Sequence, residues 1–544
     1  MEVALRVETD SRRWWALGAV TLAVLAVGLD GTVLSVALPT LAGSLHASES
    51  DLQWFQSGYL LVLAAAMLPV GLMGDRYGRK KVMLASLVLF GVGSAACAYA
   101  PSPGAFITAR ALLALAGAGV IVMSLSALTV LFREEERPRA VGIWAAANFL
   151  ALPIGPILGG WILTHYWWGW VFLLNVPVAL VGLVAVLVLV PDSRPSQRPA
   201  VDVVGVIASV AGLVGVTYGL IEAGQHGWGS TRGLVPMLAS LVLLLAFFGW
   251  ERRLSRQPGG QPLLDPALFR SASFTWGVTL QAVAILALIG VLFTMPQYFQ
   301  AVLGTDAMGS GLRLLPLIGG LIAGALPADR IARLVGAKLT VVAGFVLLAT
   351  GLVLGARTGI SSGGGFVASW MALVGFGMGI TLATTASSAL AELPEERSGV
   401  GSAVMQALNK TGGPLGSAIL GSALTAAYLG HLDLSGLSAP SADETRRSVF
   451  GGVAVAHETH SQPLLHSVQA AFTHGLDEAL IISGGIALAG AVLALLFLPR
   501  TNGATATRQT SERRRRLSSR AEQPRLRPRD RPLIATTDHA GAQR

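Results

Sequence analysis

Long stretches rich in apolar residues constrain this sequence more than any other feature. Fourteen of them recur between Trp14 and Pro499. A bilayer core is about 30 Å thick and a helix needs about 20 apolar residues to cross it, so each stretch is long enough for one transmembrane helix. Backbone groups in lipid must be hydrogen-bonded within the span, which makes helices the expected form. We therefore expect an all-α membrane protein.

The limits of each span are set where hydropathy falls and charged or turn-forming residues gather. The first span continues past Asp30 to Pro39 without a small-residue cleavage site, so we expect it to be retained and not removed as a signal peptide. The fourteen expected spans are 14–38, 52–74, 81–100, 105–131, 139–163, 167–190, 202–222, 233–250, 273–298, 308–327, 337–356, 365–390, 398–428 and 477–498.

Composition agrees with a membrane protein, because 53% of the residues are hydrophobic and only 13% are charged. The net charge of +9 lies mostly in one segment: from Arg500 to Arg544, twelve arginines stand against four acidic residues, which leaves +8. We interpret 499–544 as a disordered, Arg-rich cytoplasmic tail that could touch anionic headgroups, and expect no nucleic-acid partner. Cys97 is the only cysteine, so disulfides and cysteine metal clusters are excluded.

Loop charges predict the orientation. With the N-terminus 1–13 in the cytoplasm, seventeen Lys and Arg residues fall in inner loops, and only Arg232 and Arg357 fall in short outer loops. We therefore expect both termini to be cytoplasmic, in the cell membrane. One long outer connection, 430–476, holds five of the nine histidines, including His457. A metal site there is the alternative to a solvated loop, which we favour; we predict no metal.

Two short patterns occur twice along the chain, each time eight spans apart. The loop from Gly71 to Lys80 after the second span resembles the segment 324–338 after the tenth, and the Gly-Pro pattern 155–160 of the fifth span resembles 412–416 in the thirteenth. Two six-helix bundles, 14–190 and 273–498, separated by two inserted helices in 202–250, produce this offset. Paired bundles place a substrate site at their interface and allow alternating access by rocking.

These patterns resemble the major facilitator superfamily, and within it the fourteen-span drug:proton antiporters of the EmrB/QacA type. The resemblance covers about Trp14 to Pro499. It is carried by Leu29–Pro39, Gly71–Lys81, Gly155–Gly160, Phe172–Pro177, Asp202–Gly205, Pro262–Asp265, Leu268–Arg270 and Leu393–Gly399. It implies the major facilitator fold and proton-driven export, with no cofactor.

Some positions depart from the family pattern. Leu113 and Ala114 follow Arg110 where Gln and Gly are usual, and Gly169 stands between two tryptophans where Arg is common. An Arg-Gln pair expected in the thirteenth span is replaced by Asn409 and Lys410. The last change leaves the charge preference of the substrate open.

Ionisable residues inside spans are candidates for function, because each costs roughly 2.5–3.5 kcal/mol on insertion scales. Asp30 and Arg110 can lie at similar depth, about 12 and 8 Å below the outer surface at 1.5 Å per residue. We interpret Asp30 as the proton-coupling carboxylate, the role that the resemblance also implies, and Arg110 as its modulator; a purely structural role is the alternative for each. Lys410 is either a counter-ion for Asp30 or a substrate-binding group.

Two motifs are expected to govern the conformational change. The gate motif sits at the cytoplasmic end of the second span, where an acidic latch could form and break during opening; topology alone is the other reading of its basic residues. The resemblance suggests that the antiporter motif limits proton leak, since its small residues and proline permit a bend and close helix approach. The gate motif comprises Gly71, Gly74, Asp75, Arg76, Gly78, Arg79 and Lys80, and the antiporter motif comprises Gly155, Pro156, Gly159 and Gly160.

The function that we expect is proton-coupled export of hydrophobic or amphipathic small molecules by a monomer. Metabolite or sugar transport by the same fold is the alternative, and a non-transporting receptor is the alternative from another class. An enzyme is not expected, because no His-Glu-x-x-His or Gly-x-Ser-x-Gly pattern and no Walker A loop occurs. Candidate cavity-lining residues, for which interhelical hydrogen bonds are an equal interpretation, are Gln56, Asn148, Gln281, Gln297, Gln406 and Lys410.

Overall fold

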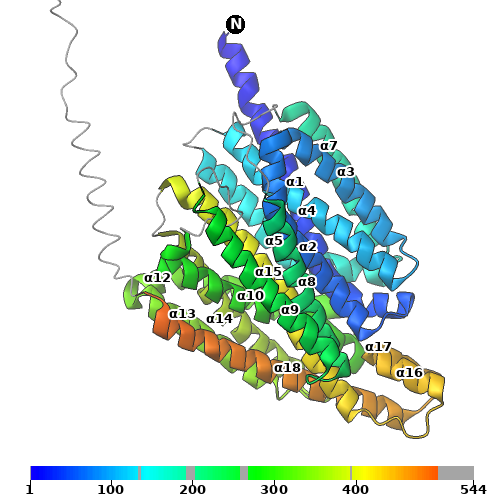
Figure 1. Cartoon of the computed structure of the whole chain (residues 1–544). Coiled ribbons are helices and arrows are strands. Elements are labelled where there is room, and N and C mark those ends of the chain that lie inside the picture. The colour runs from blue at the N-terminus through cyan, green and yellow to red at the C-terminus, as the bar shows by residue number, and fades with distance from the viewer. Residues whose placement is uncertain (1, 133–135, 191–201, 258–267, 392–394, 500–544) are drawn as a thin grey trace, which may run out of the picture. The chain divides into compact units, whose positions relative to one another are not determined.

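The computed structural model describes residues 2–132, 136–190, 202–257, 268–391 and 395–499, and within these ranges every regular element is a helix (Figure 1). The helices are α1 Glu2–Leu45, α2 Glu49–Tyr77, α3 Arg79–Ala98, α4 Pro103–Leu131, α5 Arg137–His165, α6 Trp170–Leu173, α7 Asn175–Leu189, α8 Val203–His226, α9 Thr231–Leu254, α10 Ala272–Gln297, α11 Ala307–Arg313, α12 Leu315–Val335, α13 Ala337–Gly355, α14 Gly364–Ala391, α15 Glu395–His431, α16 Ala439–Arg447, α17 Val449–Glu458 and α18 Gln462–Phe497. A single 3-10 turn, η1 Leu268–Arg270, precedes α10, and a π-helical turn, η2 Tyr298–Val302, follows it.

Helices α1–α7 pack around one apolar core and form the first bundle. Helix α1 contacts α5 and α7, while α4 contacts α2 and α3. Four fully buried phenylalanines on α2, α3, α4 and α6 fill the core: Phe55, Phe90, Phe106 and Phe172. Backbone approach is close where a small residue faces a neighbouring helix, as at Gly93, where an added Cβ would lie 3.2 Å from the backbone of Leu113.

Helices α10–α15 and α18 form the second bundle around a separate core. Helix α14 lies between α12 and α13, and α15 contacts α10 and α18. The largest buried side chains here are Trp370 and Tyr298, and the indole of Trp370 donates to the hydroxyl of Thr358 at 3.1 Å. Burial of the Trp nitrogen is therefore matched by a hydrogen bond, as the low dielectric requires.

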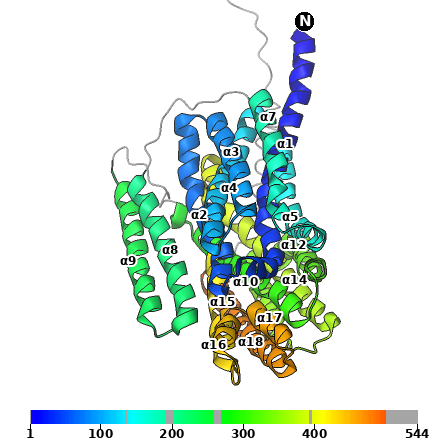
Figure 2. The ribbon, with the colours of Figure 1, turned by 90° about the vertical axis from the view of Figure 1, so that its right-hand side faces the viewer.

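Helices α8 and α9 form a pair, and α8 packs along α2 and α15 (Figure 2). The two helices approach closely at Gly219, whose added Cβ would lie 2.8 Å from the carbonyl oxygen of Gly233. On its other side α8 contacts the second bundle, where the hydroxyl of Ser422 donates to the carbonyl oxygen of Leu220 at 2.7 Å. The ring of Tyr218 lies 6.4 Å from that of Trp54 on α2, so α8 touches both bundles.

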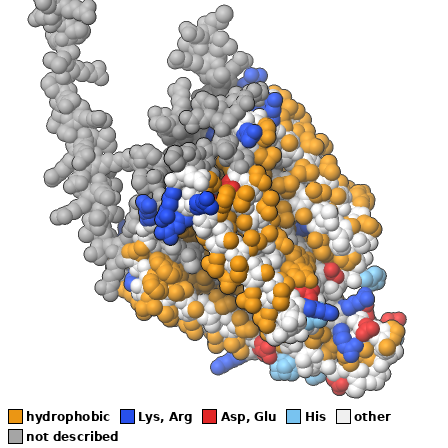
Figure 3. Space-filling view, in the orientation of Figure 1, with side chains coloured by type: hydrophobic (Ala, Val, Ile, Leu, Met, Phe, Trp, Pro, Cys, Tyr) orange, Lys and Arg blue, Asp and Glu red, His pale blue; other side chains and the backbone are white. Residues whose placement is uncertain are grey.

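The outer faces of the helices are apolar, which is the reverse of a water-soluble protein. On α9, Val235, Leu238, Val242 and Leu245 recur at helical spacing and are each at least 60% exposed. Hydrophobic side chains cover most of the face seen in Figure 3, with charged groups gathered mainly toward its margins. Such a contiguous apolar surface fits lipid and does not fit water.

Eleven helices of the described chain are long and apolar enough to cross a membrane. These eleven are α1, α3, α4, α7, α8, α9, α10, α12, α13, α14 and α18. Helices α2, α5 and α15 correspond to the other three expected spans and have 29, 29 and 37 residues, but they do not meet the same criterion over their described residues. The protein is therefore a multi-pass membrane protein, and the count of fourteen spans and its 6+2+6 division stay predictions.

The expected long outer loop 430–476 differs from the structure. Helix α15 continues to His431, α18 begins at Gln462, and helices α16 and α17 occupy much of the interval. The early start of α18 has a simple cause, because Leu464, Val468, Ala471 and Phe472 recur every three to four residues and are buried. Hydropathy alone placed the span later, since the polar side chains between these residues lower the average.

What remains of the loop is short and partly ordered by its own hydrogen bonds. The backbone N–H and the hydroxyl of Ser435 both donate to the carboxylate of Asp433, at 3.0 and 2.7 Å. These bonds hold the pKa of the Asp433 carboxyl below its ordinary value, because they stabilise its charged form. His457, His460 and His466 are exposed, and the described residues contain no group of three metal-binding side chains close enough to hold an ion.

The helices have two ends, which we name after the residues at the ends of α1 and α2. The Leu45 end is where α1 stops and α2 begins, and the Tyr77 end is where α2 stops and α3 begins. At the Tyr77 end, Gly78 joins α2 to α3 with φ of 105°, and Gly336 joins α12 to α13 with φ of 90°. Residues other than glycine rarely adopt this backbone conformation. The two related sequence segments therefore form the same sharp turn.

Candidate functional site

A buried ion pair joins α1 to α4 inside the first bundle. The Nη1 atom of Arg110 lies 2.6 Å from Oδ2 of Asp30, and both side chains are 1% exposed. The sequence predicts that these residues share a depth, and the structure brings them into direct contact. Because both charges are removed from solvent, the charge of each side chain is stabilised mainly by the opposite charge of the other.

Two further side chains surround this pair. The guanidinium of Arg110 lies over the ring of Tyr59 on α2, 3.9 Å from its centroid, in a cation–π arrangement. Tyr59 and Asn175, from α2 and α7, also lie beside the carboxylate of Asp30. Four helices of the first bundle therefore converge on one acidic group, so its charge state bears on how all four pack.

The pair is incompletely satisfied by hydrogen bonds. Among the described residues, no partner lies within hydrogen-bond geometry of Oδ1 of Asp30 or of Nε and Nη2 of Arg110, although these atoms are buried. Buried polar atoms in native proteins usually have partners, and exceptions are typical of functional sites. The arrangement is suited to a group that changes its charge and its contacts.

Small residues on α4 let this site form. Gly117 faces α1 and α2, where an added Cβ would lie 3.0 Å from Cγ1 of Val27 and 3.5 Å from the hydroxyl of Tyr59. Ala114, one of the departures from the family pattern, is fully buried, as is Leu113. Both side chains therefore contribute to the packed core, and the departure from the family pattern does not disturb the contact between Arg110 and Asp30.

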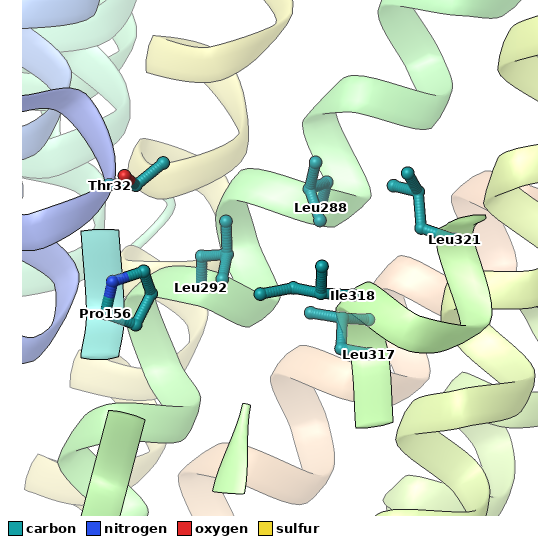
Figure 4. A pocket seen from close by; sticks show the side chains of 7 residues that line it. All are labelled: Thr32, Pro156, Leu288, Leu292, Leu317, Ile318 and Leu321. Atoms are coloured by element: carbon teal, nitrogen blue, oxygen red, sulfur yellow. The ribbon is translucent and has the colours of Figure 1, made fainter. Parts of the chain in front are cut away.

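A small apolar pocket lies between the two bundles. Thr32 of α1 and Pro156 of α5 face it from the first bundle, and five aliphatic side chains of the second bundle lie opposite them (Figure 4). These five are Leu288 and Leu292 of α10 and Leu317, Ile318 and Leu321 of α12. Asp30 does not belong to this lining, although Thr32 is only two residues further along α1.

The antiporter motif lies where α5 meets both α1 and the second bundle. A side chain at Gly155 or Gly159 would collide with Thr32 or Val33 on α1. A Cβ at Gly160 would lie 2.7 Å from the carbonyl oxygen of Ala307 on α11. The predicted close approach is therefore present, and it includes a contact across the bundle interface that the sequence did not indicate.

Polar side chains on one face of α2 link it to the second bundle; we call Glu49, Gln53 and Ser57 the α2 ladder. Gln297 donates to the carboxyl group of Glu49 at 3.2 Å, and Gln53 donates to the hydroxyl of Thr425 at 3.1 Å. The third contact joins the hydroxyls of Ser57 and Ser417 at 2.6 Å. All three lie in the half of α2 toward the Leu45 end.

Two further contacts between the bundles lie toward the same end. The side-chain amide of Gln300 donates to the carbonyl oxygen of Val36 near the end of α1, and Phe450 of α17 packs against both apolar cores. Together with the α2 ladder and the contact of α5 with α11, they close the interface at the Leu45 end.

The three candidate cavity residues whose side chains the structure describes, Gln56, Gln281 and Gln297, do not line the pocket. Gln56 is buried in α2, and its Oε1 has no partner among the described residues. Gln281 accepts a hydrogen bond from Asn409 at 2.9 Å, which fits the interhelical interpretation, and Gln297 belongs to the ladder contact. The side chains of Asn148, Gln406 and Lys410 lie outside the described residues, so the two interpretations of Lys410 both remain.

Most of the gate motif surrounds the α2–α3 turn. Gly74 packs against the side chain of Met123 on α4, and Lys80 donates to the carbonyl oxygen of Leu187 at the end of α7, at 2.9 Å. Gly71 contacts α4, Arg76 is exposed beside Tyr77, and Arg79 is half-buried. The side chain of Asp75 lies outside the described residues, so the latch stays a prediction.

Three residues of this architecture were missed as functional candidates. Tyr59 is an ordinary aromatic residue in an apolar run, and Glu49 precedes the expected second span by three residues. Asn175 was noted only as part of the segment Phe172–Pro177, which resembles a motif of the family. A search for polar residues one helical turn apart in 49–57 would have found the α2 ladder.

Known sequences identify the family. A profile of the Major Facilitator Superfamily matches residues 20–417. Among curated relatives, the tetracenomycin C resistance and export protein of Streptomyces glaucescens is 34% identical over 498 residues, covering 89% of this chain and 91% of that protein. The multidrug efflux pump LfrA of Mycolicibacterium smegmatis is 32% identical over 493 residues, covering 89% and 96%.

Solved structures agree on the fold. An inward-facing bacterial homologue of the human lysosomal transporter Spinster matches with a TM-score of 0.64 at 15% identity, over 90% of this chain and 97% of that one. A D-xylose–proton symporter matches with a TM-score of 0.58 at 15% identity, over 90% and 99%. The expected family is confirmed, and the chain belongs to the major facilitator superfamily.

Proposed function

We propose that this protein is a proton-coupled exporter of hydrophobic or amphipathic small molecules. The observation that carries the proposal is the buried Asp30–Arg110 pair, which lies inside the first bundle of a chain whose relatives include drug-export and resistance proteins. In this proposal both termini lie in the cytoplasm, the Leu45 end faces outside, and the membrane is the cell membrane. The protein works as a monomer, and the proton gradient drives it without a cofactor.

The ion pair supplies a route for coupling. When Asp30 takes a proton, Arg110 loses its counter-charge in a site where an unpaired buried cation is costly. The guanidinium must then move toward other partners, which shifts α4 and α2 against α1. The closed Leu45 end, with the pair formed, corresponds to the stage at which the proton has left toward the cytoplasm.

The pocket supports an apolar cargo over a sugar. Its lining consists of one threonine, one proline and five Leu or Ile side chains. A sugar site needs several polar groups to replace the water that hydroxyls lose on binding, whereas an apolar cargo needs mainly contact area. We therefore favour export of apolar compounds, and the metabolite or sugar alternative has no support from this lining.

Transport into everted vesicles tests the proposal. With an imposed proton gradient and a pH-sensitive dye, addition of a transported drug should release protons in the wild type and in Asp443→Asn, which removes an exposed acid. Asp30→Asn should show no drug-induced proton movement. Proton-coupled transport by Asp30→Asn at the wild-type rate would contradict the role of Asp30, and transport that ignores the gradient would contradict antiport.

A further inference from the structure

Glu49 is a buried carboxylate for which the coupling mechanism above has no use. It begins α2 at the Leu45 end, is 5% exposed, and lies at the interface between the bundles. Its one side-chain hydrogen bond among the described residues comes from Nε2 of Gln297 on α10, 3.2 Å away. A carboxylate in such a place must be paired with a cation, strongly hydrogen-bonded or protonated.

No described cation forms an ion pair with Glu49. From α15, the titratable group that faces it is Tyr428, whose hydroxyl donates to the carbonyl oxygen of Thr445. Helix α10 contains no ionisable side chain and contributes the neutral Gln297, and on α2, the helix of Glu49, Asp51 is held by Ser48 in a capping box. Within the part of the chain that the structure describes, no ion pair therefore stabilises an ionised Glu49.

Two buried amide oxygens near Glu49 also lack donors. Among the described residues, no donor reaches Oε1 of Gln297 or Oε1 of Gln53, which lies one helical turn further along α2. An ionised Glu49 has no proton to give either of them. A protonated carboxyl group supplies a donor while still accepting from Gln297, so a proton improves the hydrogen bonding of the site.

The contact exists only while the Leu45 end is closed. Glu49 belongs to the first bundle and Gln297 to the second, so separation of the bundles at this end breaks the hydrogen bond and admits water. Water stabilises the ionised form. The closed state thus favours the proton and the open state favours its release.

We propose that Glu49 is a second proton-binding carboxylate of the transport cycle, protonated while the Leu45 end is closed and ionised when that end opens. This inference rests on the alternating-access function proposed above. It makes the Leu45 end sensitive to pH independently of Asp30: acid favours closure, and rising pH favours opening because ionisation of Glu49 stabilises the open state.

Distance measurements between spin labels test the inference without requiring transport. Labels are attached to Ser44→Cys at the end of α1 and Ser361→Cys between α13 and α14, both exposed at the Leu45 end, in a Cys97→Ala background. In lipid nanodiscs, the population with a long distance should rise between pH 5 and pH 9. An unchanged wild-type distribution over this range would overturn the proposal.

Glu49→Gln is the informative variant, because the amide has the size of the carboxyl group and cannot ionise. It should remain closed across the pH range. Asp443→Asn is the matched control, since it removes an exposed acid from the same end, and it should respond as the wild type does. Retention of the wild-type pH response by Glu49→Gln would overturn the proposal.

The contributions of the other ionisable groups, His431, His474 and Asp30, need exclusion. His431 and His474 stack at this end, with ring centroids 4.7 Å apart, and histidine is an ionisable residue. The response should survive in His431→Gln and in Asp30→Asn. Loss of the pH response in either variant would assign the response to that residue and not to Glu49, and would overturn the proposal. Because Asp30→Asn also lacks transport under the proposed function, failure of that function and failure of the Glu49 inference give separate results.

A second variant keeps the test decisive if Glu49→Gln does not fold. Gln297→Met removes the donor to Glu49, and loss of this bond disfavours the ionised form within the closed interface. Because this bond forms only in the closed state, its loss also destabilises closure, so the midpoint of opening should move to lower pH by at least about half a unit, a shift comparable with loss of one hydrogen bond. An unmoved midpoint would overturn the proposal.

Discussion

At the scale of single residues, the arrangement around Arg110 depends on shape as well as charge. Its planar guanidinium contacts the carboxylate of Asp30 and lies over the ring of Tyr59. An ammonium group on a flexible stem cannot make both contacts with the same geometry. The site therefore distinguishes two residues that carry the same charge.

The first prediction concerns the energy of the buried pair. Arg110→Ala should lower the stability by about 3–5 kcal/mol, because it leaves the Asp30 charge buried and unpaired. Asp30→Ala combined with Arg110→Ala should recover a large part of this loss. Thermal unfolding in detergent, followed by tryptophan fluorescence, measures both. Additive effects of the two substitutions would show that the pair is not coupled.

The second prediction separates charge from geometry at the same position. Arg110→Lys should fold, because the positive charge beside Asp30 is kept, yet lose drug-induced proton movement in everted vesicles. The reason is that lysine makes no planar contact with Tyr59 and the carboxylate together. Tyr59→Phe, which keeps the ring beneath the guanidinium, is the comparison and should retain more activity. Full activity of Arg110→Lys would indicate that charge alone suffices.

Sequence reasoning located the Asp30–Arg110 pair but not its neighbours, and the reason is physical. A charge inside a span is conspicuous because it is costly there, so Asp30 and Arg110 stand out one by one. Tyr59 and Asn175 are not costly and acquire meaning only when four helices converge. Their contacts are long-range in sequence and follow from the fold, which the local pattern does not encode.

At the scale of elements, glycines decide which helices can touch. The third prediction contrasts two of them on α5. Gly160→Val should reduce transport and open the contact of α5 with α11, since its side chain would enter the space of the Ala307 carbonyl and such overpacking costs about 1–3 kcal/mol. Gly142→Val, where an added Cβ meets nothing within 4 Å, is the control and should transport normally.

Vesicle transport and the expression level of folded protein measure the effect of these substitutions. Equal transport by Gly160→Val and Gly142→Val would show that the approach of α5 to α11 does not limit the cycle.

The boundaries of the spans show what hydropathy does and does not predict about a helix. The hydropathy pattern predicted most helices, but it placed the start of α18 fifteen residues too late, because an amphipathic extension buries only one face.

At the scale of the whole molecule, the α2 ladder and the α5–α11 contact place the closed side of the interface at the Leu45 end. Sequence repeats predicted two similar bundles, and the described residues form two apolar cores of packed helices. Rocking of one bundle against the other stays a prediction. The repeats did not predict which end is closed, because a repeat describes the bundles and carries no information about the state between them.

The fourth prediction uses the closest polar contact of the ladder as a lock. Ser57→Cys with Ser417→Cys, in a Cys97→Ala background, should form a disulfide under oxidation, because the two hydroxyls are 2.6 Å apart. The crosslinked protein should not transport, and reduction should restore transport, since the Leu45 end must open once per cycle. Single cysteine variants should ignore the oxidant. Transport by the fully crosslinked protein would contradict alternating access at this end.

The placement of Asp30 outside the pocket lining has an evolutionary consequence. The Asp30–Arg110 pair, which we propose couples transport to protons, lies within one bundle, while the apolar lining is shared by two. Substitutions among the leucines of the lining can therefore alter which compounds are carried without disturbing the response to the gradient. A lineage with such a division can broaden its resistance spectrum one residue at a time. An inhibitor that only occupies the pocket would be evaded by the same substitutions, whereas one that wedges α1 from α4 would not.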